Sequence, residues 1–245
     1  MVEFRNEDLS GSVFDDVNLS GALLHNVLLT DATIRGAWAE RLRLDGGFGQ
    51  LVVNGVDVMP LLNAELARQH PEYALLEPDD SDGYREIWPV LEAQWATTVA
   101  RASSLSEELL HERVDGEWSF IETLRHMLFV TDAWLRRAVL GEPSPYDRLD
   151  LRHDEMPSLE GVPHDPDARP SLAEVLRLRE ERVTIVRDFF AGLTDEQLAG
   201  ETTVTGPGYP EAGTYTVQRC LRAVIDEEWW HHRFAERDLT ELERR

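Results

Sequence analysis

Lysine is missing from this chain of 245 residues, and every one of its 24 basic residues is an arginine. Catalysis through a Schiff base, which requires a lysine amine, is therefore excluded. The chain also has a single cysteine, Cys220, which rules out an internal disulfide and suits a reducing compartment. No charged segment followed by an apolar one opens the sequence, and no apolar run approaches the ~20 residues that cross a bilayer. We expect a soluble cytoplasmic protein with no membrane partner.

Positive charge is scarce as well. The 24 arginines face 47 acidic residues, which gives a formal net charge of −23 at pH 7. So acidic a protein repels the phosphates of nucleic acids, and we expect no nucleic-acid ligand. Apolar residues make up 42% of the chain, which contains seven tryptophans. This composition indicates a folded protein with a sizeable core.

The first fifty residues contain a repeat with a period of five. Apolar residues recur without interruption at nine positions, which are Phe4, Leu9, Phe14, Leu19, Leu24, Leu29, Ile34, Ala39 and Leu44. This period fits neither an α-helix nor a β-strand, whose periods are 3.6 and 2.0. A short fixed period is typical of a solenoid, in which each repeat turns a corner and points one side chain inward.

The segments Asn18-Leu19-Ser20-Gly21 and Asp31-Ala32-Thr33-Ile34-Arg35 resemble the pentapeptide-repeat family, whose members coil as a right-handed quadrilateral β-helix. The resemblance implies a short β-helix within residues 1–57, which closes with a strand at 51–53 turned by Asn54-Gly55. So short a solenoid has open ends, and we expect a structural cap or docking surface in preference to a binding site. A linker with a short helix follows at 58–78.

Residues 79–245 contain four amphipathic helical stretches, at about 82–104, 119–140, from 171 onward, and 216–242. The second opens with a capping box from Ser119 to Glu122, and the third with another from Ser171 to Glu174. A connection rich in proline and aspartate occupies about 142–170. Four helices of this length with one long crossover predict a mainly α fold, a four-helix bundle.

The fourth stretch carries a carboxylate and an imidazole on its apolar side. Glu228 and His232 interrupt a series of apolar residues at helical spacing, Val217, Leu221, Val224, Ala235 and Leu239. Residues four apart on a helix lie one above the other. A carboxylate that faces a packed interior is costly unless it is paired, and a metal ion can pair with both groups. The spacing favours His232 over the adjacent His231 as the inward imidazole.

A third ligand is expected from another helix, and the second stretch offers His126. Its neighbours in the sequence are apolar, and a histidine in such a helix needs partners for its ring nitrogens. For His126 alone, a hydrogen bond to a backbone carbonyl or a carboxylate is the favoured explanation. Together with Glu228 and His232, it predicts a metal site inside the bundle.

Residues 116–128, Gly-Glu-Trp-Ser-Phe-Ile-Glu-Thr-Leu-Arg-His-Met-Leu, resemble the second-helix signature of the DinB-like superfamily, and the resemblance covers about 80–242. These proteins are metal-binding four-helix bundles related to mycothiol-dependent maleylpyruvate isomerase and to bacillithiol transferases. In them, one histidine of this helix and two histidines of the fourth helix, four residues apart, hold a divalent metal. The resemblance implies that His126 and His232 are ligands, and that Glu228 replaces the usual middle histidine.

Two histidines and one carboxylate suit Zn²⁺, and the same set serves Fe²⁺, Mn²⁺ or Ni²⁺. The resemblance implies a metal that activates water or a low-molecular-weight thiol. Glu122 and Glu227 are candidate bases or histidine-orienting groups, with helix capping and surface exposure as the alternatives. Arg179 interrupts the apolar stripe of the third helix, and it either extends to solvent or clamps a substrate carboxylate.

Three interpretations of function follow. The first is a divalent-metal-dependent transferase or hydrolase that acts on a small molecule. The second is a non-enzymatic, acidic mimic of DNA, but residues 1–60 hold only nine acids against four arginines, a net of −5. The third is a bundle with a structural metal site. DinB-like bundles often pair, so the resemblance also allows a homodimer.

Overall fold

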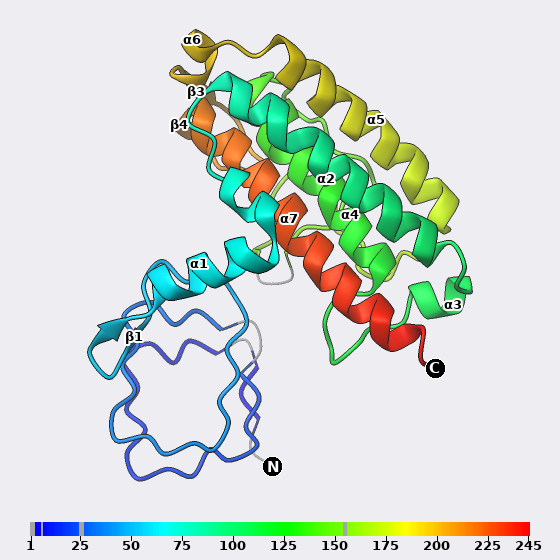
Figure 1. Cartoon of the computed structure of the whole chain (residues 1–245). Helices are drawn as coiled ribbons and strands as arrows, with labels where there is room; N and C mark the ends of the chain where they lie inside the picture. Colours follow the sequence, from blue (N-terminus) through cyan, green and yellow to red (C-terminus); the bar gives the residue numbers. More distant parts are fainter. Residues whose placement is uncertain (1–2, 6, 25–26, 154–155) are drawn as a thin grey trace.

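Four long helices form the body of the protein in the computed structural model, which describes residues 3–5, 7–24, 27–153 and 156–245 (Figure 1). They are α2 (Ser81–Ala102), α4 (Phe120–Val130), α5 (Leu172–Gly192) and α7 (Val217–Leu242). A π-helical segment, η2 (Thr131–Val139), continues α4. The prediction of a mainly α fold is confirmed. Within the described residues, no helix has both the length and the hydropathy that a membrane crossing requires.

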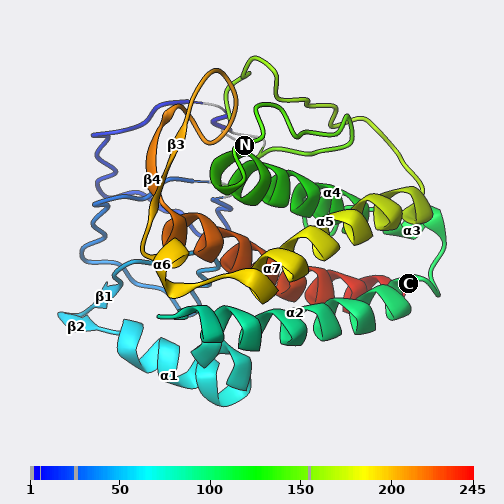
Figure 2. The same ribbon diagram turned by 90° about the horizontal axis from the view of Figure 1, so that it is seen from above.

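The four helices pack as a ring, in which α2 and α4 each contact both α5 and α7 (Figure 2). The connection between η2 and α5 spans residues 140–171 and has no helix or strand in its described part. It returns to the end of the bundle where α4 begins, so α5 runs in the same direction as α4 (Figure 1). The predicted long crossover is therefore this segment.

The apolar faces of the helices meet in one core. Aromatic side chains join α2 to α5, since Phe190 packs against Tyr84 and Trp88 with ring centroids 5.3 and 5.6 Å apart. Burial of a side chain such as Phe190 contributes about 1.5–3 kcal/mol to stability. In α7, Trp229 is fully buried and contacts Tyr73 at 5.1 Å between ring centroids. This contact attaches the segment that precedes α2 to the bundle.

Short elements lead into the bundle and cover its ends. A hairpin of β1 (Val52–Val53) and β2 (Val56–Asp57) turns at Asn54-Gly55, as predicted, and is followed by α1 (Met59–Gln69) and η1 (Pro71–Leu75). A single turn, α3 (Glu107–Leu110), lies between α2 and α4, and another, α6 (Asp195–Leu198), follows α5. The antiparallel hairpin of β3 (Glu201–Val204) and β4 (Gly213–Thr216) precedes α7, and β3 packs against η2.

The predicted β-helix is not present in the structure. The described part of residues 3–50 contains no strand and no backbone hydrogen bond between successive coils. Apolar side chains that a solenoid would enclose are exposed, by 41% at Leu9 and by 74% at Ile34. About two coils are too few to cover their own interior, because each repeat of a solenoid is stabilised by its neighbours. Residues 1–2, 6 and 25–26 of the predicted domain lie outside the described part.

The period of five nevertheless has a structural counterpart. Turns recur ten residues apart, where the backbone N–H groups of Ser12, Ala22 and Ala32 donate to the carbonyls of Leu9, Leu19 and Leu29 at 3.0 Å. The segment winds beside α1 in broad loops (Figure 1). The repeat therefore specifies turns, but in the described residues these turns do not assemble into a sheet.

Candidate metal centre

The start of α4 is fixed by its capping box. The Ser119 hydroxyl accepts from the backbone N–H of Glu122, and the Glu122 carboxylate accepts from the backbone N–H of Ser119 at 2.8 Å. Arg113 also binds this carboxylate, with an N–O distance of 2.6 Å. Glu122 therefore serves as a helix cap in an ion pair, which is one of the two roles expected from the sequence.

His126 is the central side chain of the site. Its ring is fully buried, and Nδ1 lies 2.8 Å from the backbone carbonyl oxygen of Leu151. Because a carbonyl only accepts hydrogen bonds, Nδ1 carries the proton and Nε2 presents a lone pair. Nε2 makes no hydrogen bond with the described residues and lies 3.5 Å from Oε2 of Glu227. A lone pair this close to a carboxylate oxygen is unfavourable unless a cation lies between them.

Protonation of His126 is not a favourable way to supply this positive charge. Burial lowers the pKa of His126, and it outweighs the opposing effect of the neighbouring Glu227 carboxylate. The neutral ring with its proton on Nδ1 is therefore favoured, which is the form that binds a metal through Nε2.

Helix α7 supplies a carboxylate and a second imidazole. Glu227 and His231 are four residues apart and share one face of α7, with Nε2 of His231 3.0 Å from Oε2 of Glu227. The same oxygen therefore faces Nε2 of both His126 and His231. Burial alone would raise the pKa of Glu227, but the neighbouring imidazoles of His126 and His231 lower it below its ordinary value. The carboxylate is consequently ionised.

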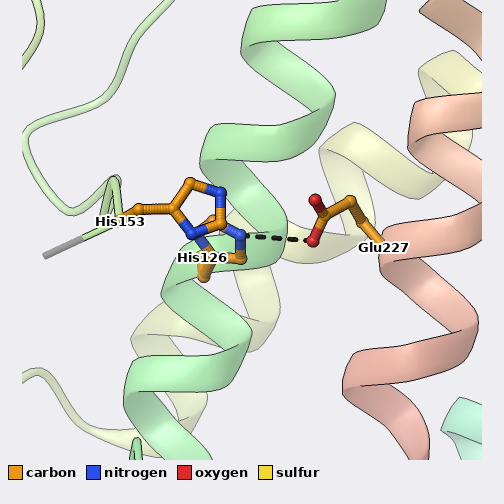
Figure 3. Close-up of side chains that lie close together, drawn as sticks. All are labelled: His126, His153 and Glu227. Atoms are coloured by element: carbon orange, nitrogen blue, oxygen red, sulfur yellow. Dashed lines mark ion pairs between the residues drawn. The ribbon is translucent and has the colours of Figure 1, made fainter. Parts of the chain in front are cut away.

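His153 comes from the connection between η2 and α5. Ligand atoms of His126, His153 and Glu227 all lie within 4.8 Å of one another, and they form the one such group of three among the described residues (Figure 3). The ring centroids of His126 and His153 are 4.4 Å apart. Two nitrogens and one carboxylate oxygen at this spacing form a donor set that suits a divalent transition metal.

Arg125 holds the segment that carries His153. Its guanidinium is fully buried and donates to three backbone carbonyls of the connection, Leu149 at 2.9 Å, Asp165 at 2.5 Å and Ala168 at 3.2 Å. The backbone N–H of Leu151 in turn donates to the carbonyl of Arg125 at 3.3 Å. Consecutive residues of α4 therefore fasten a segment without regular structure over the site, which positions His153.

An aromatic ring covers the three imidazoles. Trp118, just before α4, lies 4.6 Å from His126 between ring centroids, and stacks on His153 at 6.0 Å and on His231 at 5.8 Å. The indole shields one side of the cluster from water. Shielding lowers the local dielectric constant and strengthens the interaction of Glu227 with any bound cation.

The structure does not bring the ligands predicted on α7, Glu228 and His232, together with His126. Both oxygens of Glu228 accept from the Arg179 guanidinium, with Nη1 2.7 Å from Oε1, and Nε2 of His232 lies 2.8 Å from the Thr98 hydroxyl. Neither side chain belongs to the group formed by His126. Glu228 and His232 do face the bundle interior, but His126 points to the connection. It therefore meets the face of α7 about 100° away, where Glu227 and His231 lie.

Arg179 does not extend to solvent. It is buried, and the carboxylate that it clamps is Glu228 of the protein itself. This arrangement is an alternative to metal binding for a carboxylate on an apolar helix face, because an arginine from a facing helix can pair with it.

Glu227, which the sequence suggests as a base or an orienting group, lies at the centre of the cluster in the structure. The sequence favours His232 over His231 as the inward imidazole, although each of the two histidines follows a glutamate by four residues. No signal in the sequence pointed to His153, since residues without helical or strand periodicity cannot be placed on a face.

A family model described as the DinB superfamily matches residues 90–235, which is more than half of the chain. The matched range includes His126 on α4, the connection with His153, and the part of α7 with Glu227 and His231. Neither a search of the curated proteins nor a search of the solved structures found a match.

Proposed function

From the premise that the chain belongs to the DinB superfamily, we propose that it is a divalent-metal-dependent enzyme whose metal is held by His126, His153 and Glu227. One observation carries the proposal: Nε2 of the buried His126 faces a carboxylate oxygen at 3.5 Å and has no other partner among the described residues. A divalent cation satisfies both groups at once. The nitrogen and oxygen donors favour Zn²⁺, with Fe²⁺, Mn²⁺ and Ni²⁺ as alternatives.

When bound, such an ion would acidify a water molecule or a small thiol, which is the chemistry that hydrolysis and thiol transfer require. The residues around it have distinct tasks. Leu151 fixes the tautomer of His126, and His231 orients Glu227 through the close contact of its Nε2, 3.0 Å from Oε2. Nε2 of His231 is also the atom at which a proton can be held close to the reacting groups.

The substrate is expected to be a small molecule, and the reaction to be a hydrolysis or a transfer to or from a thiol. A purely structural metal site is the main alternative. The proposal that this chain mimics DNA is weaker, because the described N-terminal residues do not form the solenoid on which it depends. A cytoplasmic location and a homodimer stay predictions.

Reconstitution tests the proposal. The protein is stripped with a chelator, reloaded separately with Zn²⁺, Fe²⁺, Mn²⁺ or Ni²⁺, and assayed for ester hydrolysis and for conjugation of mycothiol-type and bacillithiol-type thiols. We expect activity with at least one metal and its loss in Glu227→Gln. A metal that binds and stabilises the fold, with equal rates in the wild type and Glu227→Gln, would show a structural site.

A further inference from the structure

The loop that joins β3 to β4, residues 205–212, is fastened to the bundle at its base. Arg137 of η2 is buried, and its Nη2 donates to the backbone carbonyls of Thr205 at 3.1 Å and Gly206 at 3.0 Å. Gly208 has a φ of +127°, and a Cβ at this position would lie 2.9 Å from Cζ of Arg137. The backbone of the loop therefore packs directly on the guanidinium, which a larger residue at 208 would prevent.

The next residue of the loop, Tyr209, is held by the connection between η2 and α5. The Tyr146 hydroxyl accepts from the backbone N–H of Tyr209 at 3.1 Å and donates to its carbonyl oxygen, so the loop lies beside the connection (Figure 2). The Tyr209 ring stacks on Phe129 of α4 at 5.7 Å between ring centroids, and it meets Trp134 of η2 edge to face at 5.5 Å. Both the backbone and the ring of Tyr209 are therefore fixed before any ligand binds.

This fixed ring lies near the metal centre. Phe129 also packs against His126, with 5.9 Å between ring centroids, so a single aromatic ring separates Tyr209 from a proposed metal ligand. Burial raises the pKa of the Tyr209 phenol, and among the charged groups around it the Glu227 carboxylate raises this pKa the most. The hydroxyl therefore lies within electrostatic reach of Glu227, and it keeps its proton at neutral pH and can donate.

Tyr209 is the one tyrosine of the chain whose hydroxyl makes no hydrogen bond with the described residues. The hydroxyls of the other four each donate to an oxygen of the protein, and these are Tyr73, Tyr84, Tyr146 and Tyr215. The Tyr209 side chain is half-buried, and its oxygen does not belong to the buried atoms that lack a partner, so a ligand can reach it. A rigid ring with an accessible donor that the fold does not use is well suited to hold a ligand.

We propose that Tyr209 is a substrate-binding residue of the metal centre, and that its hydroxyl donates to a carbonyl or carboxylate oxygen of the small molecule on which the centre acts. This role rests on the proposed function, because it requires a ligand beside the metal. A protonated phenol binds an acceptor oxygen, so esters, ketones and carboxylic acids fit the site, whereas alkylammonium groups do not. Because the ring is already fixed, the hydrogen bond forms with little loss of conformational entropy.

Titration with a hydroxamate tests this role without an assay of turnover. The full chain is loaded with Co²⁺, whose visible absorption reports its coordination, and titrated with acetohydroxamate, which binds divalent metals through its oxygens. We expect saturable binding to the wild type and about tenfold weaker binding to Tyr209→Phe, because a hydrogen bond to an anionic oxygen is lost. The affinity for Co²⁺ and the melting temperature should not change, since the ring that packs on Phe129 is kept.

Tyr215→Phe is the matched control. Tyr215 also packs against Trp134, at 6.1 Å between ring centroids, but its hydroxyl already donates to the carbonyl of Glu211 at 2.8 Å. This variant should bind acetohydroxamate as tightly as the wild type does. Equal affinity in Tyr209→Phe and the wild type, or an equal loss in both variants, would overturn the role of Tyr209 and leave the metal centre intact. A wild type that binds no Co²⁺, or whose Co²⁺ absorption does not respond to acetohydroxamate, would overturn the proposed function as well.

Discussion

Nε2 of His126 lies 3.5 Å from Oε2 of Glu227, although the two residues come from different helices and are 101 positions apart in the sequence. The imidazole is neutral by burial, and the carboxylate is ionised through its histidine neighbours. The two atoms that face each other can only accept hydrogen bonds, so their contact in a buried position is unfavourable by itself. A cation between them makes it favourable. The contact between His126 and Glu227 is the most direct physical argument for a metal ion at this site.

The adjacent residues Glu227 and Glu228 of α7 should give opposite results when each is replaced by glutamine, one in metal binding and the other in stability. Glu227→Gln should abolish tight metal binding, because it removes the charged ligand, with little loss of stability in the metal-free protein. Glu228→Gln should keep the metal but lower the free energy of unfolding by about 3 kcal/mol, because it leaves Arg179 buried without its counter-charge. Metal titration and urea unfolding of the metal-free variants test this. Equal metal affinity in both variants would contradict the assignment.

His153 and His231 should differ in their importance for the metal. In the proposed site, His153 is a ligand and His231 orients Glu227. His153→Ala should therefore weaken metal binding more than His231→Ala does. The His231→Ala variant should lose about 10–100-fold in metal affinity. Isothermal titration with Zn²⁺ measures both affinities. The reverse order would make His231 the third ligand.

Arg125 should affect the metal site without touching it. Arg125→Met keeps the length of the side chain but removes the donors for three carbonyls of the connection. We expect a lower melting temperature and weaker metal binding, because His153 is no longer held in place. Hydrogen exchange should show faster exchange in residues 149–168 and little change in α2. Unchanged exchange in the connection would exclude this positioning role.

A buried acid near η2 should make stability depend on pH. Burial and the adjacent Asp132 carboxylate raise the pKa of Asp150 well above its usual value of 3.8, and no donor among the described residues reaches its oxygens. Asp132 itself is bound by Arg182 and Arg136. Above pH 4, the folded protein keeps a proton on Asp150 that the unfolded chain releases, so stability falls as pH rises through this window.

Asp150→Asn should remove that dependence. The variant should match the wild type near pH 4 and become more stable than the wild type as the pH rises towards 8. Urea unfolding at a series of pH values, in the absence of metal, gives the comparison. A wild type whose stability rises over this window as much as that of the variant would show that Asp150 is not protonated in the fold.

The helices of the bundle could be predicted from the sequence because amphipathic periodicity and capping boxes are local signals. The sequence also predicts correctly that Glu228 and His232 face the interior of the bundle. Their partners could not be predicted, because the choice between Arg179, Thr98 and a metal depends on how the helices are rotated against each other. A rotation of 100° decides whether His126 meets Glu227 or Glu228, and the periodicity of one helix does not specify it.

His153 and the N-terminal segment show two other limits. The connection is held by arginine side chains that donate to backbone carbonyls, so its path has no counterpart in any pattern of apolar residues. The N-terminal repeat has a clear period, but a period specifies a solenoid only when neighbouring coils cover each other. At Phe4, Phe14 and Leu24 the structure leaves the side chains exposed by 60–62%.

Metal analysis of protein purified without chelator measures the central property most directly. The wild type and Glu228→Gln should each contain about one divalent ion per chain, whereas His126→Ala and Glu227→Gln should contain almost none. A wild type without metal that also fails to bind Zn²⁺, Fe²⁺, Mn²⁺ or Ni²⁺ on titration would contradict the proposed centre, as would full occupancy in His126→Ala.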